Sequence, residues 1–309
     1  MLSNETKEKR HFFRRIRMSL PELEDLYRER RKYQFQQGKR LKYIKIRETL
    51  YPLFAMFLKL ERIFQKQTIT ILGEAKKHRG QVIYACTHIG ENDLQSIYEV
   101  IGRGCWWFVG DPGVLYKDIS GLLLHLNGCI MLETDDKEDR HIAYLRAVEL
   151  LKGGGSLMIY PEGARNGTEN LPVMELFQGT AKMAMEANVK IIPIAIEQYD
   201  NRFVVNIGDE ILPQKYSHND ELTQNLRDTL ATLKWGIWES EGIFSRKELA
   251  PNYRQQFIKE FEARIYPYDT LETVERSRYH SKAPTPQEVF AYKNKLIPSK
   301  ANAFLLRER

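Results

Sequence analysis

The feature that most constrains the fold is an alternation of short apolar runs and helical stretches between Thr68 and Ile207. The apolar runs have the length and the β-branched composition of buried strands. The predicted strands are Thr68–Leu72, Val82–Cys86, Cys105–Val109, Cys129–Leu132, Ser156–Tyr160, Ile191–Ile196 and Phe203–Ile207. The predicted helices between them are Asp93–Gly102, Leu115–Leu126, Glu138–Lys152 and Phe177–Asn188. This alternation favours an α/β fold, with a largely parallel central sheet and helices on both faces.

The segments that flank this alternation are more polar and read as helical. We therefore divide the chain into three parts, which are residues 1–67, 68–212 and 213–309. The central part is the predicted α/β domain. The last part is expected to be a helical extension packed on that domain, with helices at Asp220–Glu239 and Leu249–Arg264.

The first part predicts N-terminal amphipathic helices. The stretch S-L-P-E that begins at Ser19 matches a capping box, and the helix should run toward Gln37. A second helix is expected from Pro52, where apolar residues repeat at three- and four-residue spacing and basic residues occupy the other faces. Basic amphipathic helices of this kind can dock on a membrane interface, and they can also pack their apolar face on a protein core.

The overall charge restricts the class of partner. The 309 residues carry a formal net charge of +6, which favours a phosphate-bearing substrate, an anionic membrane surface or nucleic acid. Arg14, Arg15 and Arg17 favour the last alternative, but they belong to no recognisable nucleic-acid-binding module. The sequence therefore argues against nucleic acid and leaves the other two partners.

Cysteine content and hydropathy bear on the compartment. Cys86, Cys105 and Cys129 are odd in number and lack CxxC spacing, which argues against a disulfide framework and against a zinc site. We expect no metal and no cofactor. The N-terminus shows no secretory signal, and no apolar run reaches the roughly 18–20 residues that span a bilayer. We expect a cytoplasmic protein, peripheral on the inner face of the membrane.

A histidine and an aspartate lie where the second predicted strand gives way to a helix. His88 follows the end of Val82–Cys86, Gly90 allows a turn, and Asp93 falls in the first turn of the next helix. Across such a junction the two side chains can face each other. The carboxylate would then hold one imidazole nitrogen and leave the other free to accept a proton, as in a general base with its orienting group.

A second cluster of polar residues follows the fifth predicted strand. Pro161 stops strand pairing and Gly163 permits a sharp turn, which would present Glu162 and Arg165 at the mouth of the sheet. Arg165 can grip a phosphate or a carboxylate through two parallel hydrogen bonds. Glu162 can accept a hydrogen bond from a substrate hydroxyl or hold Arg165. The alternative is a surface turn with a solvated ion pair.

Three ordered blocks resemble the lysophospholipid acyltransferase family, which contains the 1-acyl-sn-glycerol-3-phosphate acyltransferases. They are the His-x-x-x-x-Asp of His88 and Asp93, the run Tyr160–Arg165, and the run Ile192–Ile194. The family's usual third block reads Phe-Pro-Glu-Gly-Thr-Arg-Ser, and this chain has Tyr, Ala and Asn in place of Phe, Thr and Ser. The resemblance covers the α/β alternation. The N-terminal helices are also similar in kind to the membrane-docking helices of some members.

The resemblance implies acyl transfer. The acyl donor would be a thioester, either acyl-CoA or acyl-carrier protein, and the acceptor a hydroxyl of a lysophospholipid or a related lipid. By analogy, His88 deprotonates the acceptor hydroxyl and Asp93 orients His88, and the hydroxyl attacks the thioester without a covalent acyl-enzyme. Arg165 and Glu162, with the Gly163 backbone, would position the acceptor head group.

One block departs from the family pattern. The family's second block has Gly, an apolar pair and an Arg that binds the acceptor phosphate. Here the run from Gly128 to Thr134 contains no Arg, Glu133 stands in that neighbourhood, and Lys137 is the nearest cation along the chain. An acidic residue there would repel a phosphate. A sugar or an aminolipid therefore remains an alternative acceptor, and the acyl length and the donor carrier stay open.

Three other functions are compatible with the same residues. A thioesterase or lipase would use water in place of the acceptor, although the chain has no Gly-x-Ser-x-Gly elbow. A cysteine nucleophile at Cys86 is conceivable, but a buried structural thiol is the commoner use of such a residue. The third alternative is a non-catalytic protein that binds lipid or nucleic acid.

Overall fold

The computed structural model describes residues 17–73, 78–90, 92–110, 112–116, 119–168, 171–242, 248, 250–265 and 269–280. Its strands are β1 (Thr68–Leu72), β2 (Val82–Cys86), β3 (Trp106–Gly110), β4 (Cys129–Leu132), β5 (Leu157–Ile159), β6 (Lys190–Tyr199) and β7 (Arg202–Ile207). Its helices are α3 (Leu20–Gln36), α4 (Ile44–Thr49), α5 (Tyr51–Phe64), α6 (Asp93–Ile101), α7 (Ile119–Asn127), α8 (Lys137–Lys152), α9 (Gly179–Ala187), α10 (Asn219–Glu241), α11 (Tyr253–Glu262) and α12 (Leu271–Ser277). Two 3-10 turns are η1 (Gly113–Tyr116) and η2 (Pro213–Lys215).

Within the described part of the chain, seven strands form one sheet in the order β1-β7-β6-β2-β5-β3-β4. Every neighbouring pair is parallel except β6 and β7. These two strands form a hairpin through Asp200 and Asn201, and Asp200 adopts the left-handed conformation, φ 51°, which Asp tolerates in tight turns. The predicted α/β class with a largely parallel sheet is confirmed.

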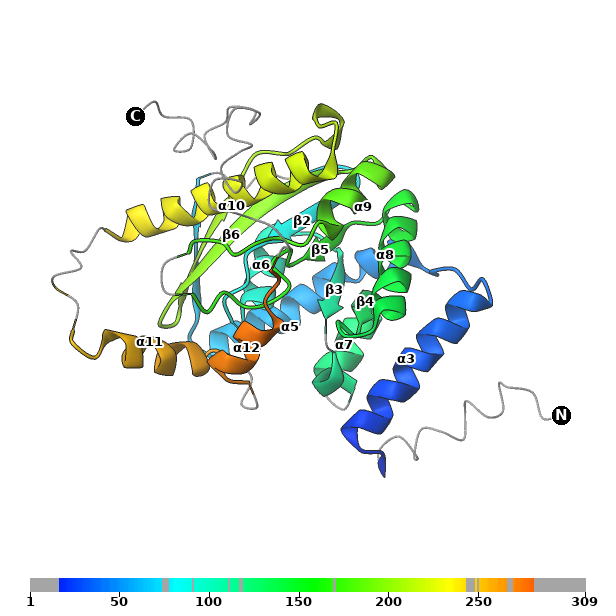
Figure 1. The fold of residues 1–309 in the computed structure, drawn as a ribbon, viewed down its shortest axis with the longest axis horizontal. Helices are drawn as coiled ribbons and strands as arrows, with labels where there is room; N and C mark the ends of the chain where they lie inside the picture. Colours follow the sequence, from blue (N-terminus) through cyan, green and yellow to red (C-terminus); the bar gives the residue numbers. More distant parts are fainter. Residues whose placement is uncertain are drawn as a thin grey trace.

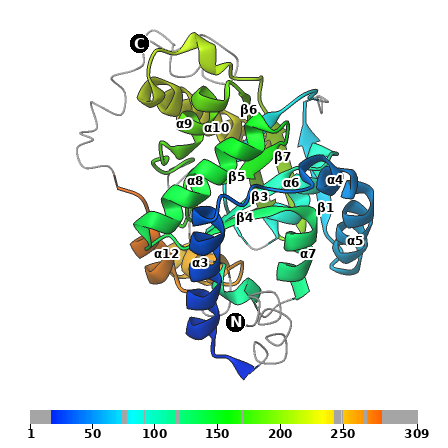
Figure 2. The ribbon, with the colours of Figure 1, turned by 90° about the vertical axis from the view of Figure 1, so that its right-hand side faces the viewer.

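Helices cover both faces of the sheet, as Figure 1 and Figure 2 show. One core lies between the sheet and α8, α9 and α10, and the other lies between the sheet and α5, α6 and α7. The side chains of β2 alternate between them, since Ile83 and Ala85 join the first core whereas Val82, Tyr84 and Cys86 join the second. Burial on both faces explains why β2 is a continuous apolar run rather than an alternating one.

The predicted boundaries differ from the observed ones where tertiary pairing decides them. The expected strand Ile191–Ile196 continues to Tyr199, because its last residues pair with β7. The expected helix Leu115–Leu126 is divided into η1 and α7. The predicted helix Leu249–Arg264 begins at Tyr253, and Leu249 itself lies outside the described residues.

The N-terminal segment contributes α3, α4 and α5, while its first 16 residues lie outside the described part. Helix α3 begins with the predicted capping box, in which Ser19 and Glu22 bond each other's backbone. It lies beside η1 and α8 (Figure 2). Among the described residues, no helix combines the length and the apolar composition needed to cross a bilayer.

The C-terminal extension contacts the α/β domain in two places. Helix α10 packs along β6 and β7, and its apolar residues contribute to the core between the sheet and α8, α9 and α10 and to a smaller cluster with β6 and β7. Helices α11 and α12 lie at the opposite end of the extension (Figure 1). Phe261, Ile265 and Val274 bury Ala164 and Met174, which belong to the loop after β5. The extension therefore supports the turn that carries Glu162 and Arg165.

Candidate active site

His88 is held at the edge of the sheet by the residue before it. Thr87 extends the ladder beyond β2, with its N–H donating to the Ile194 carbonyl at 3.0 Å and its hydroxyl accepting from the Ile196 N–H at 3.0 Å. The His88 carbonyl accepts from the Asn166 N–H at 2.9 Å, across the sheet edge. Because β2 and β5 are adjacent and parallel, their carboxyl ends bring His88 close to the turn after β5.

The predicted meeting of His88 and Asp93 is present. The imidazole Nδ1 donates to Asp93 Oδ2 at 2.7 Å, and the N–H groups of Ile89 and Gly90 donate to the same oxygen at 2.8 and 3.2 Å. The turn thus wraps around a fully buried carboxylate. Burial alone would raise the pKa of Asp93, but the imidazole and these hydrogen bonds outweigh it and hold the pKa below its ordinary value. The carboxylate is ionised.

The other imidazole nitrogen has a different environment. Among the described residues, no hydrogen-bond partner engages His88 Nε2, and 18% of the His88 side chain is exposed. Since Asp93 fixes Nδ1 as the protonated nitrogen, Nε2 carries the lone pair. The arrangement can accept a proton from a group that approaches the carboxyl end of β2.

Tyr160 belongs to this site, and the sequence argument did not single it out. Its ring stacks on the His88 imidazole, with centroids 4.0 Å apart and planes 14° from parallel. Its hydroxyl donates to Asp93 Oδ1 at 2.8 Å. The sequence does contain a signal that points to Tyr160. A Tyr stands where the family usually has Phe, and only Tyr carries a hydroxyl that could bond a neighbour.

Glu162 lies deeper than its predicted place at the mouth of the sheet. It is fully buried, and its carboxylate accepts from the Met174 N–H at 2.8 Å and from the His88 N–H at 3.4 Å. Burial raises the pKa of Glu162 to about 7, against the opposing effect of the Met174 N–H and the charge of Lys234. Glu162 therefore fastens the loop after β5 to the backbone of His88.

Gly163 and Arg165 form the outer part of the same turn. Gly163 has φ +71°, and a Cβ there would lie 2.3 Å from the ring of Phe177, so this position accepts no other residue without rearrangement. The Arg165 side chain is 12% exposed, and its Nη1 lies 3.1 Å from Asp269 Oδ2. The predicted anion-binding guanidinium is thus partly engaged by a carboxylate of the C-terminal extension.

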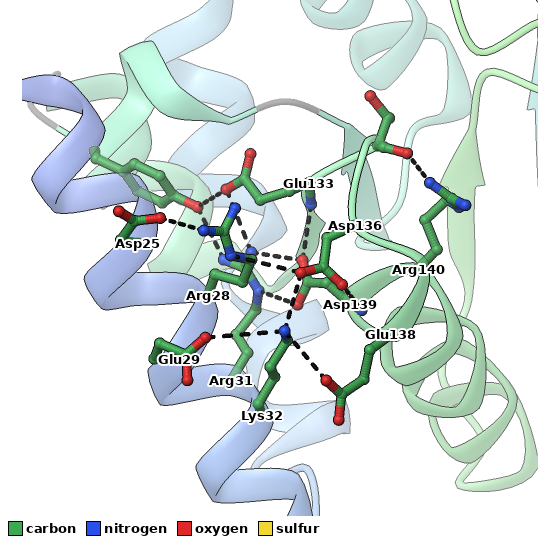
Figure 3. A network of polar contacts seen from close by, with 12 residues as sticks. Asp25, Arg28, Glu29, Arg31, Lys32, Glu133, Asp136, Glu138, Asp139 and Arg140 are labelled. Carbon is green, nitrogen blue, oxygen red and sulfur yellow. Dashed lines mark hydrogen bonds and ion pairs between the residues drawn. The ribbon is translucent and has the colours of Figure 1, made fainter.

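Glu133, which the sequence placed near the acceptor site as a repelling charge, has partners from distant parts of the chain (Figure 3). It accepts from the Tyr116 hydroxyl at 2.7 Å and from Arg31 Nη2 at 3.3 Å. Arg31 also makes a two-point contact with Asp139, with Nε–Oδ1 at 3.0 Å and Nη2–Oδ2 at 2.6 Å. We call Arg31, Tyr116, Glu133 and Asp139 the Arg31 cluster. The cation that contacts Glu133 is therefore Arg31 of α3 and not Lys137, the nearest one along the chain.

A second row of cations extends the Arg31 cluster. Lys32 lies 2.9 Å from Asp136 and 3.1 Å from Glu138, and Arg140 donates to the Thr134 carbonyl. Figure 3 shows the basic side chains of α3 directed at the acidic loop before α8. The end of β4 is thus a region of compensated charge rather than an isolated acidic patch.

The structure also bears on the alternative nucleophile and on metals. Cys86 is fully buried in the core beneath α6, and burial raises the pKa of its thiol well above the ordinary value. That environment suits a structural thiol, not a nucleophile. The described residues contain no group of three or more His, Cys, Asp or Glu side chains placed to hold a metal ion.

Comparisons with known proteins identify the central segment. Residues 68–197 match the family model described as Acyltransferase. A 1-acyl-sn-glycerol-3-phosphate acyltransferase of Borreliella burgdorferi is 28% identical over 46% of this chain and 50% of its own length. An uncharacterized acyltransferase of Schizosaccharomyces pombe is 24% identical over 44% of this chain and 50% of its own length. The chain thus spans about half the length of these curated relatives.

A solved structure shares the fold. The crystal structure of the 1-acyl-sn-glycerophosphate acyltransferase PlsC from Thermotoga maritima matches with a TM-score of 0.52 at 17% identity, covering 69% of this chain and 88% of that one. At this identity the likeness concerns the fold alone. Together with the sequence matches, it supports one statement: residues 68–197 match the Acyltransferase family, and this part of the chain is similar to the 1-acyl-sn-glycerol-3-phosphate acyltransferases.

Proposed function

We propose that the protein transfers a fatty acyl group from a thioester donor to a hydroxyl of a lipid acceptor, with His88 as the general base. The observation that carries this proposal is the 2.7 Å contact between His88 Nδ1 and the buried Asp93 carboxylate. This contact leaves His88 Nε2 directed away from Asp93. Nε2 lies at the carboxyl ends of the strands, where parallel sheets bind their ligands. The match of residues 68–197 to the Acyltransferase family model supports the same chemistry.

The reaction needs one proton acceptor and no covalent intermediate. Nε2 of His88 removes the proton of the acceptor hydroxyl while the hydroxyl oxygen attacks the thioester carbonyl carbon. The C–S bond breaks, and the imidazolium returns the proton to the departing thiolate. Asp93 stabilises the transient imidazolium, because its carboxylate is already ionised. A positioned base contributes roughly 10²–10⁴-fold, so orientation of the two substrates supplies the rest.

We assign the turn after β5 to the acceptor. Arg165 would bind the anionic part of the head group, and Gly163 would let its backbone approach closely. Glu162 positions this turn against His88 through its contacts with the N–H groups of Met174 and His88. A phosphate-bearing acceptor is the better candidate, because Arg31 and Tyr116 compensate Glu133. The name of the Borreliella burgdorferi relative supports a lysophospholipid rather than a sugar or an aminolipid.

The acyl donor is acyl-CoA or acyl-carrier protein. Both present the same thioester group, so the proposed chemistry at His88 is the same for either donor. A positively charged protein surface suits both, since the CoA phosphates and the carrier protein are anionic.

We further propose that the protein works on an anionic membrane surface, at the inner face of the membrane. Helix α5 buries Phe54 but leaves most of its apolar residues exposed by about half or more, namely Leu53, Met56, Phe57, Leu60, Ile63 and Phe64. Arg62 binds Glu99 of α6 through two hydrogen bonds of 2.8 and 2.9 Å. The exposed face is therefore fixed to the helix that carries Asp93, which suits delivery of a lipid to the site.

Acyl transfer is tested by incubating the protein with labelled acyl-CoA and a panel of lysophospholipids and glycolipids. We expect a labelled phospholipid product and stoichiometric free thiol, and a loss of about 10²–10⁴-fold in H88A. His141→Ala, which removes an exposed histidine of α8, is the matched control and should retain activity. Thiol release that needs no acceptor would identify a thioesterase, and wild-type protein without turnover on any acceptor would contradict the proposal.

Membrane docking is tested by sedimentation with vesicles of anionic or zwitterionic phospholipid. Phe57→Ser should weaken binding to the anionic vesicles about tenfold, because it removes one apolar ring from the exposed face. Trp235→Ser changes an exposed aromatic residue of α10 and should not affect binding. Equal binding by wild type and Phe57→Ser would locate the membrane contact elsewhere.

A further inference from the structure

Tyr160 contacts both members of the His88–Asp93 pair from the neighbouring strand. Its ring covers one face of the imidazole at 4.0 Å, and its hydroxyl reaches Asp93 Oδ1 at 2.8 Å. The two contacts come from one residue directly after β5, whereas His88 and Asp93 belong to the junction of β2 and α6. Tyr160 therefore connects the His88–Asp93 pair to the end of β5, a strand to which neither His88 nor Asp93 belongs.

The hydroxyl changes the charge that His88 faces. Asp93 Oδ2 already accepts three hydrogen bonds, from Nδ1 of His88 and from two backbone N–H groups. The Tyr160 hydroxyl is the donor to the other oxygen, Oδ1. A donor at a carboxylate stabilises its charged form and reduces its pull on a second donor. Burial and the charge of Asp93 raise the pKa of Tyr160 well above its ordinary value, so the hydroxyl keeps its proton and stays a donor.

The other ionisable groups around the pair act from further away. Cys86 lies behind Asp93 as a buried, protonated thiol. Glu162 meets the His88 backbone and not its ring, and Arg165 affects the Tyr160 hydroxyl through its charge. Arg264 of the C-terminal extension approaches Gly90 with its backbone and Cβ. The Tyr160 hydroxyl is thus the side-chain group best placed to adjust the Asp93 carboxylate.

We propose that Tyr160 is a positioning residue that limits how strongly Asp93 stabilises the protonated form of His88, so that its hydroxyl sets the pH above which the base is available. This inference rests on the proposed acyltransferase function for its kinetic consequence. The ring of Tyr160 has a separate role. By stacking on the imidazole of His88, it holds the imidazole in the plane that directs Nδ1 at Asp93 and Nε2 at the substrate. The hydroxyl and the ring can be tested one at a time.

Tyr160→Phe keeps the ring and removes the hydroxyl. Asp93 then faces His88 with more of its negative charge, the imidazolium is stabilised, and the imidazole holds its proton to a higher pH. We expect the acidic limb of the pH profile of kcat/KM to move upward by about half a pH unit to one pH unit. Tyr160→Leu removes the ring as well, and we expect kcat to fall at least about tenfold with KM changed less than about twofold.

Tyr98→Phe is the matched control. Tyr98 lies on the same helix as Asp93, is buried, and donates its hydroxyl to Asn127, so the variant loses a comparable hydrogen bond away from His88. Its stability should fall, but its pH profile should superimpose on that of the wild type. A Tyr160→Phe profile that also superimposes on the wild-type profile would overturn the proposal, and so would an equal shift in both variants.

A readout without turnover separates this inference from the proposed function. In protein labelled with ¹⁵N histidine, the Nδ1–H proton of His88 is assigned by its loss in H88A. Its resonance should move downfield in Tyr160→Phe, because the hydrogen bond to Asp93 strengthens, and should not move in Tyr98→Phe. An unmoved resonance in Tyr160→Phe refutes the role of Tyr160 even if the enzyme is active. A shifted resonance in a protein that transfers no acyl group refutes the proposed function and keeps the coupling.

Discussion

Two polar regions lie at the same edge of the sheet and are built in opposite ways. The candidate active site pairs His88 with an aspartate five residues away and leaves one imidazole nitrogen without a protein partner among the described residues. The Arg31 cluster joins Arg31 to Asp139, 108 residues away, and every charge in it has a partner. The first arrangement can exchange a proton with a substrate, whereas the second compensates Glu133 and holds α3 against α8. An available lone pair, and not the number of charges, distinguishes the reactive region from the structural one.

The largest expected effect is the loss of activity in Asp93→Asn, which changes the candidate active site and leaves the Arg31 cluster intact. Asp93→Asn keeps the size of the side chain but removes the charge that stabilises the imidazolium, and its amide can present N–H to Nδ1. We expect kcat to fall by about 10³–10⁴-fold, as wrong-tautomer substitutions of this kind do. Steady-state kinetics with a saturating acyl donor measure this. A loss below about tenfold would mean that Asp93 is structural.

Arg31→Ala tests the structural region in the same way. It leaves Asp139 with a buried charge and without its two-point partner, because the Asp139 side chain is only 1% exposed. We expect the free energy of unfolding to fall by about 2–3 kcal/mol, less than for a fully buried pair because Arg31 itself is one-fifth exposed. Urea denaturation measures the change, and kcat should stay within about threefold of the wild type.

Arg28→Ala is the control for that substitution, since Arg28 is on the same helix but is more exposed than Arg31, and its partners are the exposed Asp25 and, at 3.6 Å, the partly exposed Asp136. Its effect on unfolding should be below about 1 kcal/mol. If both arginine variants lost the same stability, or if Arg31→Ala lost its activity, the division between the two regions would be wrong.

A glutamate of the candidate active site and an aspartate beside the Arg31 cluster should change the stability with pH in opposite directions. Burial raises the pKa of Glu162 from 4.5 to about 7, so the folded state binds its proton more tightly than the unfolded state does. The stability that this group contributes is fully present below about pH 4.5 and is lost as pH rises through about 7, by up to about 3 kcal/mol. Asp136 behaves in the opposite way: the Asp139 N–H and then Lys32 lower its pKa, so its contribution is lost as pH falls.

Urea denaturation from about pH 2 to pH 8 separates the contribution of Glu162 from that of Asp136. The free energy of unfolding of the wild type, measured relative to Glu162→Gln, should decrease as pH rises through 7. Measured relative to Asp136→Asn, it should instead decrease as pH falls below the ordinary range of an aspartate. A wild-type curve parallel to that of Glu162→Gln would show that Glu162 does not titrate in this interval.

The smallest expected effect concerns Asp269, whose carboxylate pairs with Arg165. Asp269→Asn frees the guanidinium from its 3.1 Å partner, so an anionic acceptor no longer competes with a carboxylate of the protein itself. We expect the KM for a phosphate-bearing acceptor to fall about 3- to 10-fold, while kcat is unchanged. Asp220→Asn removes an exposed charge of α10 and should leave KM as it is. A rise in KM would mean that Asp269 orients Arg165 for the acceptor.

The sequence predicted what depends on neighbours along the chain. The strands, the meeting of His88 with Asp93 and the capping box at Ser19 depend on short-range patterns, and the structure contains all of them. Tyr160 could not be placed on Asp93 from sequence alone, because their contact requires β2 and β5 to be neighbours in the sheet.

Contacts between distant segments escaped the sequence for the same reason. Arg31 reaches Asp139 and Glu133, and Arg165 reaches Asp269, across more than a hundred residues in each case. The sequence therefore described Glu133 as a charge that would repel a phosphate and placed Glu162 at the mouth of the sheet. In the structure, Arg31 contacts Glu133, and Glu162 is buried against the backbone of Met174 and His88.

The seating of α11 and α12 on the loop after β5 has a consequence for biosynthesis. Phe261, Ile265 and Val274 bury the loop residues Ala164 and Met174, and Arg264 closes on Gly90. A ribosome-bound nascent chain can complete the sheet, whose last strand ends at Ile207, before Phe261, Arg264, Ile265 and Val274 have emerged from the exit tunnel. The turn that carries Glu162 and Arg165 would then gain its support only in the last stretch of translation. A chain that stops before residue 253 would complete the sheet without that support.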